Sequence, residues 1–172
     1  MSLDSFLSEQ YQRHNRRRQE HLTTLRLNLA GRRVLEIGAG IGDHTDFFVD
    51  RGCIVTTTDG RPECVDALRK RFPGLKIVLF DANKPPPADL EPHDVVYAYG
   101  ILYHLRDPAG ALRTMAHLCA DMLLLETCVS GGTDSRLVVA NEAIDDPTQA
   151  LDGHGCRPTR HWVWDRLTEQ FP

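Results

Sequence analysis

The residues best suited to chemistry form a glycine-rich turn at residues 36–42, with the sequence EIGAGIG. The turn directly follows an apolar run and precedes a stretch with helical spacing. Glycines there let the backbone approach a ligand and adopt unusual dihedral angles, and the following helix presents unpaired N–H groups at the same place. The pattern predicts a small-molecule site, although a tight structural turn would use the same glycines.

The spacing of the glycines narrows the class of ligand. A dinucleotide fingerprint needs G-x-G-x-x-G, but Asp43 stands where the third glycine belongs and the turn holds no phosphate-binding lysine. The Asp43 carboxylate would repel a pyrophosphate at the start of the helix, whereas a cofactor without phosphate meets no such repulsion. The turn therefore disfavours NAD, FAD and ATP.

Two carboxylates follow at the ends of the next two apolar runs. Asp59, with Gly60 beside it, lies roughly 20 residues beyond the turn, where a carboxylate suits the two hydroxyls of a ribose. Asp81 ends the following run and can accept a hydrogen bond from the amino group of an adenine. The alternatives stay open: Asp59 can cap the next helix, and Asp81 alone favours neither a binding role nor a structural one.

The candidate catalytic groups follow the fourth apolar run, in the sequence YHLR at residues 103–106. His104 can act as a general base near neutral pH, or it can simply hydrogen-bond its own loop. Tyr103 can take part in proton transfer, although it and Tyr99 are more simply walls of a pocket. The sequence therefore predicts an acceptor site next to His104.

Two basic segments are candidates for binding the acceptor. Residues 155–162, GCRPTRHW, bring together Arg157, Arg160 and His161, and arginine forks suit a carboxylate or a phosphate. A polar helix start with surface ion pairs explains the same residues. The arginine run at residues 16–18 is either a solvated helix face or a contact to an anionic substrate.

Short apolar runs alternate with helical stretches after Gly31, which predicts a Rossmann-like, doubly wound and mostly parallel α/β sheet. Five runs carry apolar residues on both alternations, as strands covered on both faces require. They are residues 33–37, 54–58, 76–80, 95–99 and 122–127. Because the carboxyl ends of parallel strands meet at one edge, the turn and both carboxylates should share a crevice.

We expect residues 1–30 to be an N-terminal helical segment of the same domain, and residues 31–172 to form the sheet domain. Pro62 and Pro108 suit first helical turns, whereas the three prolines at 85–87 exclude a helix there. A further helix is expected around residues 134–143, and a last one from Pro158 toward Gln170.

Composition bounds the class of protein. With 172 residues, of which 41% are hydrophobic and 26% charged, the chain suits one globular domain. The net charge of −4 disfavours broad nucleic-acid binding. No apolar run approaches the roughly 18 residues of a membrane span, and no signal segment opens the chain, so we expect a cytoplasmic protein with no membrane contact.

The five cysteines form no CxxC pair, which argues against a zinc site and a disulfide framework. Four of them lie in apolar stretches, where we expect buried thiols. Cys156 lies in a polar segment and is the expected exposed exception.

The combined motifs resemble those of the class I S-adenosylmethionine-dependent methyltransferases. The resemblance is carried by VLEIGAGIG at residues 34–42, by Asp59 and Asp81, and by YAYGILYHL at residues 97–105. It covers roughly residues 31–128, and it implies S-adenosylmethionine as the cofactor and S-adenosylhomocysteine as the product.

The resemblance also implies a role for each residue of the motifs. The methionine part of the cofactor would be surrounded by Glu36, Gly38 and Gly40, the ribose held by Asp59 with Gly60, and the adenine by Asp81 with Ala82. Tyr99 and Gly100 would line the floor near the sulfonium. Tyr11 and His14 would lie over the cofactor, where Tyr11 is a further candidate for binding the acceptor.

Members of this family usually finish with a β-hairpin that pairs with the fifth strand, and this sequence ends after one more helix. We therefore expect the sheet to lack that hairpin. A homodimer, or a C-terminal domain missing from this sequence, would cover the exposed edge.

The expected activity is methyl transfer to an oxygen, or less readily to a nitrogen or carbon, of a small-molecule or saccharide-like acceptor. No metal is expected, because the fourth strand ends in Tyr99 and Gly100 rather than in a carboxylate. The alternatives are a non-catalytic subunit that binds S-adenosylmethionine or S-adenosylhomocysteine, and an RNA-modifying methyltransferase that uses the N-terminal arginines.

Overall fold

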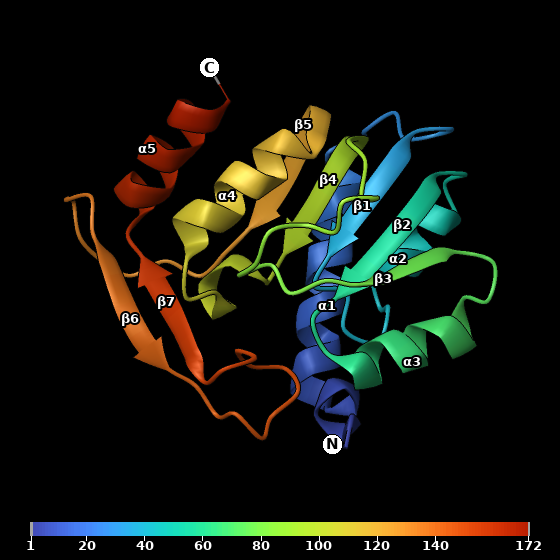
Figure 1. The fold of residues 1–172 in the computed structure, drawn as a ribbon, viewed down its shortest axis with the longest axis horizontal. Helices are drawn as coiled ribbons and strands as arrows, with labels where there is room; N and C mark the ends of the chain where they lie inside the picture. Colours follow the sequence, from blue (N-terminus) through green and yellow to red (C-terminus); the bar gives the residue numbers. More distant parts are fainter. Residues whose placement is uncertain (1, 172) are drawn as a thin grey trace.

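A five-stranded parallel sheet organises the computed structural model, which describes residues 2–171 (Figure 1). The strands are β1 (Arg33–Ile37), β2 (Ile54–Asp59), β3 (Lys76–Leu79), β4 (His93–Tyr99) and β5 (Cys119–Glu126). Their order is β3-β2-β1-β4-β5, so the direction of winding reverses between β1 and β4. This doubly wound sheet confirms the predicted fold class, and all five predicted strands are found, with ends that differ by at most three residues.

Helices cover both faces of the sheet (Figure 1). They are η1 (Asp4–Leu7), α1 (Glu9–Thr24), α2 (Thr45–Val49), α3 (Pro62–Arg71), η2 (Leu102–His104), α4 (Pro108–His117) and α5 (Arg160–Gln170). Alternate residues of β1 face opposite sides, as the strand period of two requires. Val34 packs with Leu22 of α1 and Phe48 of α2, whereas Leu35 packs with Leu112 of α4.

The helical start and stop signals agree with the structure. Pro62 and Pro108 stand in the first turns of α3 and α4, and the Asp107 side chain caps α4 by accepting from the Gly110 N–H at 2.9 Å. The segment with three prolines between β3 and β4 contains no helix. None of the helices in residues 2–171 is long and apolar enough to cross a membrane.

The helix predicted around residues 134–143 is wrong, because this segment forms a strand. β6 (Leu137–Asn141) pairs antiparallel with β7 (His154–Pro158), and the two make a separate hairpin beside the main sheet (Figure 1). Val138 and Val139 lie opposite Arg157 and Cys156. β-branched side chains fit a pleated strand better than a helix, and pairing with a distant segment decides the outcome here.

The hairpin packs on η2 rather than on the edge of the sheet. Within the described residues β5 pairs with β4 alone, which agrees with the expectation that no hairpin extends the sheet at β5. Pro158 ends β7, so the last helix begins two residues later, at Arg160.

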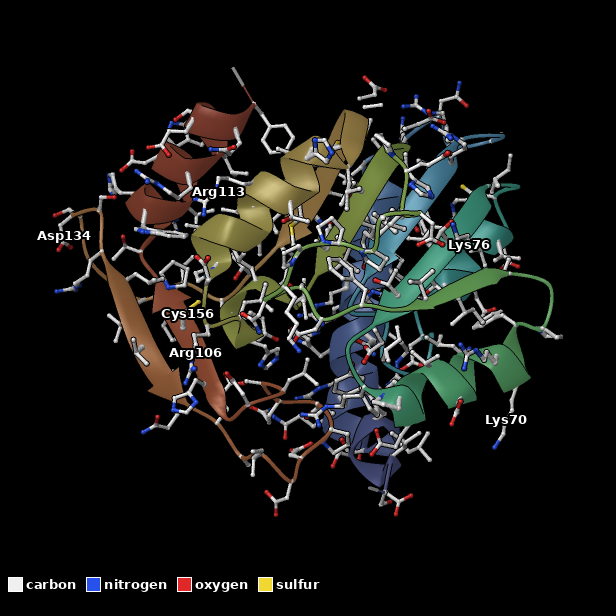
Figure 2. All side chains as sticks on the ribbon, viewed as in Figure 1. Lys70, Lys76, Arg106, Arg113, Asp134 and Cys156 are labelled. Carbon is white, nitrogen blue, oxygen red and sulfur yellow. The ribbon has the colours of Figure 1, made fainter. Side chains whose placement is uncertain are left out.

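Two predictions about cysteines are wrong. Cys156 is buried on β7 and its thiol donates to the Leu102 carbonyl of η2 at 3.4 Å, so it forms part of the contact between the hairpin and η2 (Figure 2). Cys128 is exposed just after β5, while Cys53 and Cys119 are only partly buried. The polar residues around Cys156 in sequence led to the wrong prediction, because its burial depends on the hairpin.

A buried carboxyl group lies at the centre of the sheet, on β1. Glu36 is 1% exposed, and its Oε2 accepts from the Thr45 hydroxyl at 2.6 Å and from the Thr57 hydroxyl at 3.0 Å. Burial raises the pKa of Glu36 to about 7, against the lowering effect of the two hydroxyls. The group joins β1 to β2 and to the first turn of α2.

This raised pKa makes stability depend on pH in a defined direction. The unfolded chain releases the Glu36 proton near its ordinary value of 4.5, before the folded chain does, so Glu36 destabilises the fold as the pH rises toward about 7. Glu36→Gln removes this titration. The unfolding free energy of the wild type, relative to that of Glu36→Gln, should fall by on the order of 3 kcal/mol between about pH 4 and pH 8.

Urea unfolding at a series of pH values measures this difference. Glu20→Gln, at an exposed position of α1, serves as the control and should follow the wild-type curve. Parallel pH dependence of the wild type and Glu36→Gln would contradict the assignment.

Candidate functional site

A cavity opens at the carboxyl ends of β1, β2 and β4, where the winding of the sheet reverses. Its empty volume is about 750 Å³, mouth included, and η1, α1 and residues 147–151 also contribute to its walls. Ten of the predicted site residues line it: Tyr11, Gly38, Gly40, Asp59, Gly60, Ala82, Tyr99, Gly100, Tyr103 and His104.

The other predicted residues lie elsewhere. Glu36 is buried beneath the glycine turn, and Asp81 accepts from the Asn83 N–H at 3.0 Å and pairs with Lys84 at 3.0 Å. Arg157 lies behind Tyr103, with its guanidinium 5.3 Å from the centre of that ring. Arg160 and His161 are exposed at the start of α5 and do not line the cavity.

The glycine turn presents bare backbone to the cavity. Gly38 and Gly40 have φ angles of 75° and 58°, in the left-handed region that favours glycine. A Cβ on Gly40 would come within 2.7 Å of the Phe6 ring. The Gly38 and Ala39 N–H groups donate to the Thr58 carbonyl at 3.0 and 2.9 Å, which fixes the turn to the end of β2.

Asp59 lies at the end of β2, between the cavity and the backbone N–H groups that it holds. It is 8% exposed and lines the cavity, while its Oδ2 accepts from the Gly40 N–H and its Oδ1 from the Arg61 N–H, both at 2.8 Å. Burial raises the pKa of Asp59, and the two backbone donors oppose that shift. Each carboxylate oxygen has a second lone pair, so these structural bonds leave acceptor capacity for a ligand hydroxyl.

Arg18 is a functional candidate that the sequence did not single out. It is 9% exposed, lines the cavity, and donates to Oε2 of Glu126 at the end of β5 at 2.7 Å. A Cβ on Gly100 would come within 2.6 Å of its guanidinium. Helical spacing could have found it, because Arg18 shares a face of α1 with Tyr11 and with the buried Leu22.

His104 is held by a second residue that the sequence did not reveal, Glu142. Nδ1 of His104 hydrogen-bonds Oε2 of Glu142, whose side chain is 3% exposed. The same carboxylate accepts from the Ala150 N–H at 2.8 Å and from the Arg157 guanidinium at 3.0 Å. Glu142 directly follows β6, so its position depends on the hairpin.

The electrostatics of this pair favour a neutral imidazole beside an ionised carboxylate. Burial lowers the pKa of His104, and the bond to Glu142 only partly opposes that shift. Burial raises the pKa of Glu142, but its bonds to His104, Ala150 and Arg157 outweigh that effect and lower it. Nδ1–H therefore donates to Glu142, and Nε2 keeps a lone pair that can accept a proton.

Related proteins were found by sequence. An uncharacterised methyltransferase of Mycobacterium tuberculosis is 37% identical over 92 residues, which cover 54% of this chain and 37% of that protein. A tRNA U34 carboxymethyltransferase of Alcanivorax borkumensis is 30% identical over 122 residues, which cover 67% of this chain and 38% of that protein. The chain thus spans less than two fifths of the length of these curated relatives.

Solved structures share the fold at low sequence identity. The N-terminal domain of EvdMO1 with SAH bound superposes with a TM-score of 0.74 at 20% identity, over 88% of this chain and 70% of that one. A Burkholderia thailandensis 1,6-didemethyltoxoflavin-N1-methyltransferase, with its substrate and S-adenosylhomocysteine bound, gives 0.62 at 18% identity, over 97% of this chain and 69% of that one.

The chain also matches a protein family as a whole. The model of a family described as a methyltransferase domain matches residues 10–168, which include the glycine turn, the carboxyl ends of the five strands and the hairpin. This chain therefore belongs to the methyltransferase domain family.

Proposed function

We propose that this chain binds S-adenosylmethionine in the cavity and transfers its methyl group to an oxygen of a small-molecule or saccharide-like acceptor. The observation that carries the proposal is the meeting of the glycine turn, Asp59 and His104 in one cavity at the reversal of the sheet. Membership of the family and the S-adenosylhomocysteine bound to structural neighbours support it.

The lining residues fit an adenosyl sulfonium compound. Phe80, Ala82 and Leu105 supply apolar walls for a flat base, and the Asp59 carboxylate suits ribose hydroxyls. Tyr11 and Tyr99 offer aromatic faces to a cation. Among the described lining residues there is no lysine for a phosphate, and Glu126 balances the charge of Arg18.

The bound cofactor would supply an electrophilic methyl group on a positively charged sulfur. The residues of the chain then have to align an acceptor oxygen and take up its proton. Nε2 of His104 can accept that proton, because Nδ1–H is committed to Glu142. The Glu142 carboxylate then stabilises the imidazolium that forms. Residues 147–151, together with Phe6 and Tyr11, cover the cavity and limit access of water.

The ribose role of Asp59 predicts a loss of cofactor affinity in Asp59→Asn. An amide can accept one of the two backbone bonds but not both, so we expect a loss of stability of about 1 kcal/mol. Because the amide also bonds hydroxyls less strongly than a carboxylate, affinity for S-adenosylhomocysteine should fall by about tenfold. Calorimetric titration measures this affinity and thermal unfolding the stability.

Asp66→Asn, on the exposed face of α3, is the matched control and should bind like the wild type. Equal affinities for S-adenosylhomocysteine in Asp59→Asn and the control would remove Asp59 from the ribose contact.

The general-base role predicts that His104→Ala loses methyl transfer but keeps the cofactor. With radiolabelled S-adenosylmethionine and a pooled extract of hydroxyl-bearing metabolites, the rate should fall by about 10²-fold or more, the range typical of a lost general base. Affinity for S-adenosylhomocysteine should stay within about twofold, because the imidazole acts on the acceptor. His117→Ala, at the end of α4, controls for the loss of a histidine.

Glu142→Gln tests the partner of the base. The carboxylate raises the pKa of His104 against burial, so the variant should show a lower His104 pKa by nitrogen-15 NMR titration and a smaller loss of transfer rate than His104→Ala. An unchanged pKa would contradict the pairing. Absence of transfer in the wild type, with S-adenosylhomocysteine bound, would favour a non-catalytic binding subunit.

A second candidate function is RNA modification. The relative named a tRNA U34 carboxymethyltransferase and the exposed arginines of α1 favour it, whereas the net charge of −4 opposes it. This function requires that the protein bind tRNA and that the affinity fall steeply as the salt concentration is raised.

A further inference from the structure

A second cavity adjoins the first and shares part of its wall. It lies between η1, α1 and residues 146–149, with an empty volume of about 1260 Å³, open mouth included. Tyr11, Arg18, Tyr103 and His104 line both cavities. A molecule in the second cavity can therefore reach the imidazole of His104.

The second cavity is strongly basic. Its lining includes Arg13, Arg17 and Arg18, and Asp146 is the one carboxylate among the described residues that line it. Three arginines thus face one carboxylate, whose Oδ1 accepts from the N–H and the hydroxyl of Thr148 at 3.0 and 2.8 Å. Positive charge in this cavity is therefore in excess.

Two of these arginines are available to a ligand. Arg18 is paired with Glu126, but the side chains of Arg13 and Arg17 are exposed and make no hydrogen bond or ion pair with other residues between positions 2 and 171. They stand four positions apart on α1, so their side chains lie one above the other on the same face. Two stacked guanidinium groups suit an acidic group with several oxygens.

The state of His14 reflects this excess of charge. His14 lies between the two arginines in sequence and also lines the second cavity. Burial lowers its pKa, and the charges of Arg18 and Arg17 lower it further, whereas Glu126 opposes them. A neutral imidazole at this position adds no further charge and leaves the two free guanidinium groups as the main attraction for an anion.

We propose that the second cavity binds an acidic group of the methyl acceptor, a carboxylate or a phosphate, through Arg13 and Arg17. The acceptor hydroxyl then lies toward His104, where the two cavities meet. The proposal rests on the proposed function, and it restricts the acceptor to small molecules with an acidic group at one end and a hydroxyl at the other.

The distribution of charge on α1 favours a small anion over an extended polyanion. Arg16, the neighbour of Arg17, lines a different hollow. Asp43, Asp46 and Asp50 also line that hollow, and Arg71 pairs there with Asp43 and Asp46. Of these two hollows, only the second cavity has a single carboxylate among its described lining residues, and a nucleic-acid backbone would need the positive charge to continue across the surface.

The test uses inorganic phosphate and acetate as separate probes at constant ionic strength, with the protein saturated with S-adenosylhomocysteine. The double variant Arg13→Gln/Arg17→Gln should bind the preferred probe about tenfold or more weakly than the wild type. Arg16→Gln is the matched control and should keep wild-type affinity. Calorimetry measures the affinities, and the tighter probe identifies the acidic group.

The same titrations separate this proposal from the proposed function. Both arginines are outside the cofactor cavity, so S-adenosylhomocysteine affinity and melting temperature should match the wild type in the double variant. If the wild type fails to bind S-adenosylhomocysteine, the proposed function is overturned. If it binds that compound but neither probe, or binds a probe with equal affinity in the double variant, the acidic-group site is overturned.

Binding of total tRNA tests whether the arginines of α1 bind an extended polyanion instead of a small acidic acceptor. Salt-sensitive tRNA binding that weakens equally in Arg16→Gln and in the double variant would indicate an extended polyanion surface and overturn the proposal. No tRNA binding, together with probe binding lost only in the double variant, supports a small acidic acceptor.

Discussion

The contact between the Asp59 carboxylate and the Gly40 N–H is the constraint on which the site depends. It joins the turn after β1 to the end of β2, and the second oxygen of the same carboxylate holds the start of α3 through Arg61. The left-handed glycines keep that turn free of side chains. The Asp59 carboxylate therefore fixes the position of the glycine turn relative to the start of α3.

The cover over the cavity is attached to the same region. Oδ2 of Asp43 accepts from Gln12 at 2.8 Å and from Asn15 at 3.0 Å, which fastens α1 just beyond the glycine turn. The Asp43 carboxylate, which the sequence predicts to repel a pyrophosphate, therefore also positions α1. Tyr11 and Arg18 reach the cavity because α1 is held at this point.

Much of the fold could be predicted because the central strands are buried on both faces and the strands carry apolar residues on both alternations. Nine of the ten predicted lining residues follow from topology, since parallel strands bring their carboxyl ends together, whereas Tyr11 on α1 followed from the resemblance alone. The hairpin could not be predicted, because β6 is stabilised by pairing with β7. The two strands are far apart in sequence, and Leu137 lies opposite Pro158. The position of Glu142 beside His104 and the burial of Cys156 both depend on that pairing, so neither could be predicted from the sequence. Arg18 was hidden for a different reason, because three adjacent arginines differ only in the helix face that each occupies.

The close approach of Gly100 to the Arg18 guanidinium has a consequence for the evolution of this family. A side chain at position 100 would force the guanidinium to shift from the place in which it bonds Glu126. Positions 18, 100 and 126 should therefore be substituted together among homologues, as residues in direct contact are. Lineages that keep glycine after the fourth strand should also keep the cation and its counter-ion, although the three positions lie far apart in sequence.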